Sequence, residues 1–175
     1  MTTQELIDLR TCILQGRTGD ALVIVDELDA MSKKDIIRKI KSYLIVMLIH
    51  LIKNQVERRL TNSWAASIRY AIMEIQDLNL RPNKTSYFIK EDEWEEMLEN
   101  AIESAIDSAS AEVENGVYSP FQLEEMVDIN SLIKTAKSFL ALTYSYSAKD
   151  LLAVIKHNLA LLPGGEDWKF GSRNK

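Results

Sequence analysis

A stretch of ten residues, Tyr43 to Ile52, is apolar apart from His50 and constrains the fold more than any other part of the sequence. The stretch is too short to cross a membrane, because a spanning helix needs about 20 predominantly apolar residues. A helix that is apolar on all sides and too short to span a membrane is normally buried among other helices. We therefore expect this segment to lie at the centre of a helical core.

The helix that carries the apolar stretch is predicted to run from Ser32 to Arg59. Ser32 and Asp35 have the spacing of a capping box, and Met31 and Ile36 have the spacing of a hydrophobic staple around it. Both patterns mark the start of a helix, so we expect the preceding helix to end just before residue 32.

Helical periodicity with start and stop signals recurs along the rest of the chain, and no segment alternates convincingly like a strand. Helices are expected at residues 3–14, 20–30, 63–78, 91–114, 131–143 and 148–162, with a short one beginning near residue 120. The sequence thus predicts an all-α, single-domain helical bundle of about seven to eight helices around a buried central helix at residues 32–59. Residues 80–90 are predicted to form a loop, and residues 163–175 a frayed tail.

Charge is distributed unevenly along a chain whose net charge is −5. Residues 32–90 carry a net charge of +8, whereas residues 91–114 carry ten acids and no base. The basic part could bind an anion, or it could pair with the acidic helix of the same chain or of another subunit. An acidic chain without a dense run of Lys and Arg is a poor candidate for nucleic-acid binding.

Catalytic and metal-binding motifs are missing from the sequence. It contains no HExxH, no ExxH, no Gly-rich phosphate loop and no GxSxG, and two histidines with one cysteine are too few for an ordinary zinc site. We therefore predict no catalytic residue, no metal and no cofactor, and we lean towards a protein that is not an enzyme. The amino-terminal residues lack a basic segment followed by an apolar one, so we expect no signal peptide and a cytoplasmic protein.

His50 is the single polar residue of the apolar stretch, and it has two interpretations. It could lie in a semi-buried pocket, tuned by Glu57 or Lys53, and act as a base or a ligand. Alternatively, it is a core histidine whose ring nitrogens are hydrogen-bonded to the backbone or to a neighbour. We favour the second interpretation, because buried polar groups normally have partners.

A basic cluster brackets the turn between the central helix and the next helix. Its cations could clamp a phosphate or a carboxylate, with His50 as base or donor and Trp64 as a wall of the site. The alternative is a solvated or ion-paired surface, since exposed ion pairs are common and weak. The candidate ligand-binding residues are His50, Lys53, Arg58, Arg59, Trp64 and Arg69.

Three stretches of the chain resemble one known family. They are GDALVIVDELDAMSKKD (Gly19 to Asp35), YLIVMLIHLIKNQVERR (Tyr43 to Arg59) and SWAASIR (Ser63 to Arg69). Together they resemble the domain-of-unknown-function family numbered twenty-nine, a bacterial family found mostly in photosynthetic bacteria. The positions that match its pattern are His50, Lys53, Arg58, Arg59, Ser63, Trp64 and Arg69. The resemblance covers roughly residues 1–130 and implies an all-helical, cytoplasmic protein of unestablished function.

We accordingly predict one domain over residues 1–162, with a family-like core at 1–130 and extra helices at 131–162. The missing catalytic motifs and the uneven charge favour a non-catalytic protein-interaction or self-association module, whose partner is a protein or a second copy. The first alternative is an anion or small-ligand site, possibly enzymatic, around His50 and the arginines. The second alternative is nucleic-acid binding through residues 53–69.

Overall fold

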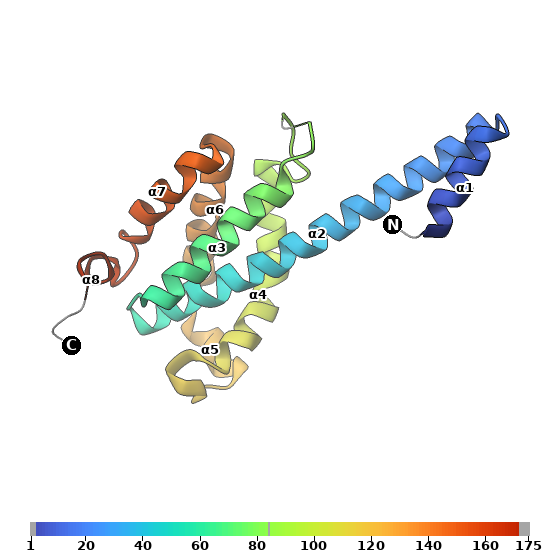
Figure 1. Cartoon of the computed structure of the whole chain (residues 1–175). Helices are drawn as coiled ribbons and strands as arrows, with labels where there is room; N and C mark the ends of the chain where they lie inside the picture. Colours follow the sequence, from blue (N-terminus) through green and yellow to red (C-terminus); the bar gives the residue numbers. More distant parts are fainter. Residues whose placement is uncertain (1–2, 84, 172–175) are drawn as a thin grey trace. The chain divides into compact units, whose positions relative to one another are not determined.

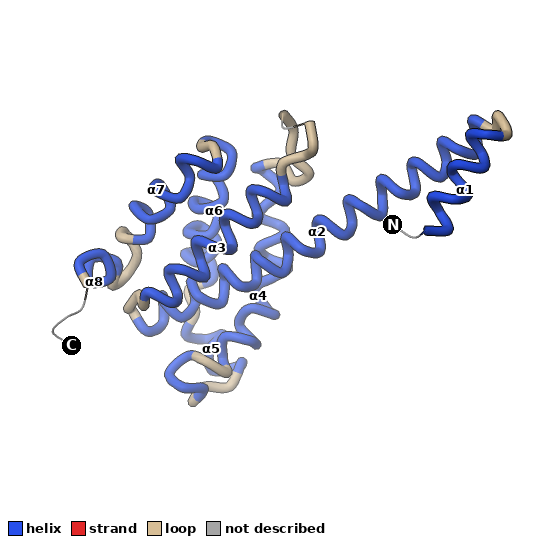
Figure 2. Tube along the Cα trace, in the orientation of Figure 1, coloured by secondary structure: helices blue, strands red, loops and turns tan. Residues whose placement is uncertain are grey.

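The computed structural model describes residues 3–83 and 85–171, and every regular element in this part of the chain is a helix (Figure 1). The helices are joined by short loops (Figure 2), and the only strand-like pairing in the described ranges is one isolated bridge between Leu80 and Tyr87. The predicted all-α class is confirmed. The chain forms two compact units, Met1–Lys39 (unit 1) and Ile40–Lys175 (unit 2), and each is described by itself.

Helix α2 runs without a break from Thr18 to Glu57 and contributes to both units. The predicted helix start at Ser32 is therefore wrong, as is the separate helix expected at residues 20–30. Nothing between Asp20 and Glu57 stops a helix, because this range contains neither glycine nor proline. A serine inside a helix costs only about half a kcal/mol relative to alanine, so a potential cap is overridden when the chain can continue.

Unit 1 consists of helix α1, Thr3–Leu14, a short turn, and the first part of α2. Gly16 adopts a left-handed conformation in the turn, with φ 69°. Cys12 of α1 is buried, and so is Ala21 at the start of α2. Few other side chains of the unit are shielded from solvent: Leu9, Ile24 and Leu28 are half-buried. The inner packing of unit 1 is therefore small.

The core of unit 2 contains the second part of α2, as predicted for the central helix. Six of its apolar side chains are at most 2% exposed: Ile40, Leu44, Met47, Leu48, Leu51 and Ile52. Helix α3, Asn62–Asn79, packs against α6, Ile129–Ser145, and α7, Ala148–Leu159. Helix α4, Trp94–Ser110, packs against α6 and against the short α5, Pro120–Met126. Two 3-10 turns flank α4: η1, Glu91–Glu93, and η2, Val113–Gly116.

Side-chain caps mark the starts of several helices in unit 2. The short helix predicted near residue 120 is α5, and it begins with a capping box of Ser119 and Gln122. Helix α3 is capped by Thr61, whose hydroxyl accepts from the Trp64 amide at 3.1 Å. Where a frayed tail was predicted, Gly165–Phe170 form helix α8, while residues 172–175 lie outside the described range.

Four side-chain amides of α2 and α3 hold the loops of unit 2 in place. Gln55 accepts from the Asp128 amide at 2.9 Å and donates to its carbonyl at 3.1 Å, at the start of α6. Gln76 donates to the carbonyls of Thr143 and Tyr146 at 3.0 and 2.8 Å, at the end of α6. The other two are Asn54 and Asn79, described below. Because an amide both donates and accepts, it can replace two backbone partners at once.

Tyr144 is the centre of a mostly buried polar network in unit 2. Its hydroxyl accepts from Trp94 Nε1 at 2.7 Å and from Asn79 Nδ2 at 3.1 Å, and donates to the Ile89 carbonyl at 2.6 Å. Asn79 in turn accepts from the Ile89 amide at 2.7 Å. Burial raises the pKa of Tyr144 to about 12. The network anchors the loop at residues 80–90 to α3, α4 and α6.

Candidate functional site

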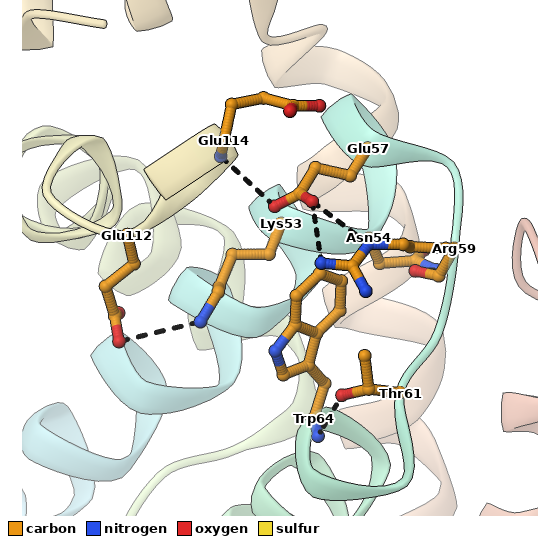
Figure 3. Close-up of polar contacts among 8 residues, drawn as sticks. All are labelled: Lys53, Asn54, Glu57, Arg59, Thr61, Trp64, Glu112 and Glu114. Atoms are coloured by element: carbon orange, nitrogen blue, oxygen red, sulfur yellow. Dashed lines mark hydrogen bonds and ion pairs between the residues drawn. The ribbon is translucent and has the colours of Figure 1, made fainter. Parts of the chain in front are cut away.

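The indole ring of Trp64, at the start of α3, is the centre of the predicted cluster (Figure 3). The ammonium of Lys53 lies 5.0 Å from the ring centroid, and the guanidinium of Arg59 lies 4.7 Å from it. Both distances are those of cation–π contacts. Lys53 belongs to the last turns of α2 and Arg59 to the link that follows, so the short α2–α3 connection brings the three residues together.

Each of the two cations at Trp64 is paired with a carboxylate. Lys53 Nζ lies 3.5 Å from Glu112, and Arg59 contacts Glu57 through Nη2 at 2.9 Å and Nε at 3.0 Å. The second oxygen of Glu57 accepts from the backbone amide of Glu114 at 3.4 Å (Figure 3). The charges of Lys53 and Arg59 are thus balanced by neighbouring carboxylates. This corresponds to the ion-paired alternative considered for the basic cluster.

Asn54 fixes the backbone of the α2–α3 link against the loop between α7 and α8. Its amide donates to the carbonyl of Arg59 at 3.0 Å and to that of Pro163 at 2.7 Å. Gly164 follows with φ 70°, and a Cβ atom built there would lie 2.7 Å from the Cα of Arg59. The approach of the two backbone segments therefore requires glycine at position 164.

Arg58 occupies a different place from Lys53 and Arg59. It directly follows the last residue of α2 and has a left-handed backbone conformation, with φ 54°. Its backbone amide donates to the Asn54 carbonyl at 2.9 Å. Its exposed side chain makes no ion pair within the described ranges. Arg58 and Arg59 line a cleft of about 510 Å³ between the link and α8. The other lining residues are Leu60, Thr61, Asn62, Gly164, Asp167, Trp168 and Gly171.

His50 is half-buried, and its Nδ1 atom is buried without a hydrogen-bond partner in the described structure. The expectation that both ring nitrogens are hydrogen-bonded is therefore wrong for Nδ1. The pKa of His50 is lowered, first because burial disfavours the charged ring and second because Lys53 repels it, whereas Glu112 acts in the opposite direction. Lys53 was one of two residues predicted to tune this ring, while the carboxylate involved is Glu112 and not Glu57. The lowered pKa favours a neutral imidazole at neutral pH.

The predicted ligand-binding set is thus only partly assembled. Lys53, Arg59 and Trp64 are in contact, Arg58 borders the cleft, and His50 is influenced by the charge of Lys53. Arg69 is half-buried on α3 and makes no hydrogen bond or ion pair with the described residues.

Sequence reasoning missed the two residues that complete the cluster, Glu112 and Gly164. Glu112 stood inside the segment predicted as the acidic helix, yet α4 ends at Ser110. Only the opposite charges of residues 32–90 and 91–114 pointed to such a pairing. Gly164 lay inside the segment predicted as a frayed tail, and its contact with Arg59 has no local signature in the sequence.

The acidic residues 91–114 are mostly exposed, and two of them pair with cations elsewhere in unit 2. Besides Glu112 with Lys53, Glu95 lies 3.3 Å from Lys137 of α6. Among the described residues, no three His, Cys, Asp or Glu side chains are grouped so that they could hold a metal ion. None of the described helices is both long enough and apolar enough for a membrane crossing.

These observations define an all-helical protein with a balanced cation–aromatic cluster at a helix junction. The family model for the domain of unknown function DUF29 matches residues 15–132, and the chain belongs to that family. The match includes all six predicted ligand-binding residues. No curated protein and no solved structure matches the chain significantly.

Proposed function

We propose that this protein is a non-catalytic interaction module that binds another polypeptide through unit 1. The proposal rests on one observation. Four apolar side chains of α1 and α2, Leu6, Ile13, Leu22 and Val25, are 45%, 63%, 58% and 44% exposed. We call these four residues the apolar face. Soluble proteins rarely expose a contiguous apolar surface unless a partner covers it.

Helical spacing places the two members of each pair on the same side of their helix. Leu6 and Ile13 are seven residues apart, and Leu22 and Val25 are three apart, so each pair lies along one line of its helix. A groove of about 390 Å³ in unit 1 is lined by other residues of the two helices: Asp8, Thr11, Cys12, Arg17, Asp20, Val23, Ile24 and Glu27. The apolar face is therefore separate from this groove.

The balanced charges at Trp64 support the same proposal. Lys53 and Arg59, two of the four basic residues predicted to clamp an anion, already have carboxylate partners. A ligand anion would have to compete with Glu112 and Glu57 for them. Lys53 is also buried, which removes it from any surface that could contact nucleic acid, so binding through residues 53–69 gains no support.

The test is a retention assay with the tagged full-length chain, combined with light scattering of the eluted material. We expect the tagged chain to retain a second polypeptide, either its own untagged copy or another protein, and Leu22→Asp to abolish the retention. The matched control is Phe121→Asp in α5, where the side chain is 80% exposed, and it should bind as the wild type does. Equal retention by both variants, or none by the wild type, would contradict the proposal. Circular dichroism verifies that both variants are folded.

A second candidate, an anion site, is favoured by the cleft beside Arg58. This guanidinium is exposed, lacks an ion pair within residues 3–83 and 85–171, and borders a cleft of about 510 Å³ that also contains Trp168. Calorimetric titration with inorganic phosphate and pyrophosphate tests it. Binding that weakens about tenfold or more in Arg58→Gln, and is unchanged in Arg69→Gln, supports the site. Absence of heat with both anions excludes it.

A further inference from the structure

We infer that the cleft beside Arg58 binds a nucleotide, with the phosphate at the α2–α3 link and the base against Trp168 of α8. The inference rests on the anion site named above as the second candidate, and it adds the chemical class of the ligand. It does not depend on the interaction proposed for unit 1. The volume of the cleft, about 510 Å³, lies within the range of roughly 300–1,000 Å³ that is typical of small-molecule sites.

Arg58 is the cation of the cleft that can turn to a ligand. Arg59 also lines the cleft, but its guanidinium is held by Glu57 at 2.9 Å and lies over the Trp64 ring. The exposed side chain of Arg58 makes no hydrogen bond, ion pair or ring contact with the residues that the structure describes. A guanidinium in this state offers paired N–H donors that match the oxygens of a phosphate.

The backbone of Arg58 is strained, and no contact of its side chain offsets the strain. With φ 54° it has the left-handed conformation that glycine or asparagine commonly adopts directly after a helix. An arginine there carries the added cost of its Cβ atom. Residues that break a local rule without a gain in folding occur most often at functional sites. The side chain of Arg58 therefore has the properties of a ligand contact.

Trp168 supplies the aromatic wall of the cleft. Its Nε1 donates to Oδ1 of Asn62 at 3.1 Å, which links α8 to the first residue of α3. This bond occupies the polar edge of the half-buried indole, so the surface that remains for a ligand is the apolar ring. Aromatic side chains stack on nucleobases, and the stacking accepts any base because every base has a π-face.

The polar groups around this ring fit the sugar and the phosphate. Because the oxygen of Asn62 accepts from Trp168, the amide nitrogen of Asn62 keeps its donors for a ligand. Asp167 lines the same cleft, and a carboxylate has several acceptor sites, so it can accept from a ribose hydroxyl in addition to its contact within the chain. A bare phosphate gains nothing from a carboxylate or an indole, whereas a nucleotide uses both.

Calorimetric titration of the full-length chain with adenosine monophosphate (AMP), ribose 5-phosphate and adenosine tests the ligand class. AMP should bind about tenfold or more tightly than either of its parts, because it alone engages the guanidinium and the indole together. Pyrophosphate should displace AMP, since both occupy Arg58. An affinity for AMP that is no higher than the affinity for either part overturns the inference.

Two aromatic positions of α8 test the stacking. Trp168→Leu removes the ring and should weaken AMP binding about tenfold or more, while ribose 5-phosphate binds as before. Trp168→Phe keeps a ring and should retain most of the affinity. The matched control is Phe170→Leu, because Phe170 is 79% exposed and does not line the cleft. Equal weakening in Trp168→Leu and Phe170→Leu would contradict a base at Trp168.

Arg58→Gly separates binding from folding. Glycine fits the left-handed conformation at this position, so thermal unfolding should occur at a temperature no lower than in the wild type. The affinity for AMP should nevertheless fall about tenfold or more. Unchanged AMP binding in this variant overturns the inference. A clear loss of stability also counts against it, because the side chain would then belong to the fold.

The failure of this inference can be told apart from the failure of the anion site. Binding of pyrophosphate without a preference for AMP overturns the nucleotide and leaves the anion site standing. Absence of heat with every phosphate-bearing compound overturns both. An oligoadenylate strand that binds more than about tenfold more tightly than AMP would identify a nucleic acid as the partner, which overturns the assignment to a free nucleotide.

Discussion

The ammonium nitrogen of Lys53 lies 3.5 Å from a carboxylate oxygen of Glu112, and the two side chains differ sharply in exposure, at 9% and 51%. Removing either partner should therefore have unequal effects. Glu112→Gln leaves a buried ammonium without a counter-ion and should cost about 1–3 kcal/mol of unfolding free energy. Lys53→Met leaves Glu112 solvated and keeps the apolar stem against Trp64, so it should change stability by less than about 1 kcal/mol.

Urea denaturation of the two single variants and of the double variant measures this asymmetry. The double variant should unfold much as Lys53→Met does, because no unpaired buried charge remains in it. The same loss of stability in both single variants would mean that the pair is governed by its mutual attraction and not by the burial of Lys53.

Gly164 should be intolerant of any side chain. In Gly164→Ala the left-handed backbone conformation becomes strained by about 1–2 kcal/mol, because the residue now carries a Cβ atom. The added Cβ also overlaps with the backbone of Arg59. Gly171→Ala provides the control, because Gly171 has φ 78° and no atom within 4 Å of an added Cβ. Thermal unfolding should therefore show a clearly larger loss for Gly164→Ala, and similar losses would imply that the two backbone segments separate easily.

Tyr144→Phe should destabilise the protein by about 1–3 kcal/mol, because it leaves buried polar groups of Trp94, Asn79 and Ile89 with fewer partners. Tyr146→Phe removes the same hydroxyl from a side chain that is 41% exposed and should change stability by less than about 0.5 kcal/mol. Urea denaturation compares the two. If Tyr144→Phe left the free energy of unfolding unchanged, water would be replacing the hydrogen bonds of the Tyr144 hydroxyl.

His50 should make the stability depend on pH in a defined direction. Its pKa is lower in the folded chain than its ordinary value near 6.5, so the unfolded chain binds the proton more readily. Stability is therefore full above about pH 6.5 and falls as the pH drops through the interval between the two pKa values. His50→Leu should lose this dependence.

Denaturation series between about pH 5 and pH 7.5 check this expectation, with His157→Leu as the control, since His157 is exposed on α7. The difference in unfolding free energy between the wild type and His50→Leu should grow in favour of the variant as the pH falls. A difference that is constant across the series would place His50 in an environment no different from water.

Much of the fold could be predicted because helix signals are local. The bounds of α1 are as predicted, and those of α3 differ from 63–78 by one residue at each end. The place of residues 43–52 in the core followed from their composition, although Val46 within this stretch is exposed. The continuous α2 was not predicted, because a cap motif states where a helix can begin and not whether the preceding helix ends there.

The candidate site could be predicted only as a set of neighbours in sequence. Lys53, Arg59 and Trp64 lie within twelve positions of each other, so a short link between two helices was enough to bring them together. Glu112 and Gly164 are more than fifty and a hundred positions from Lys53 and Arg59, and no local pattern encodes such approaches. For the same reason, the amide contacts of Gln55 and Gln76 with α6 were not foreseen.

The contacts of Asn54 with Pro163, and of Gln76 with Thr143 and Tyr146, bear on how this protein can be truncated. The family match stops at residue 132, within α6. A fragment of residues 15–132 would lack α7 and most of α6, both of which pack on α3. It would also leave the Gln76 amide without its two acceptors and the Asn54 amide with the Arg59 carbonyl alone. Such a fragment should aggregate or give poorly dispersed nuclear magnetic resonance spectra, so the smallest autonomous form of this protein reaches at least to Gly164.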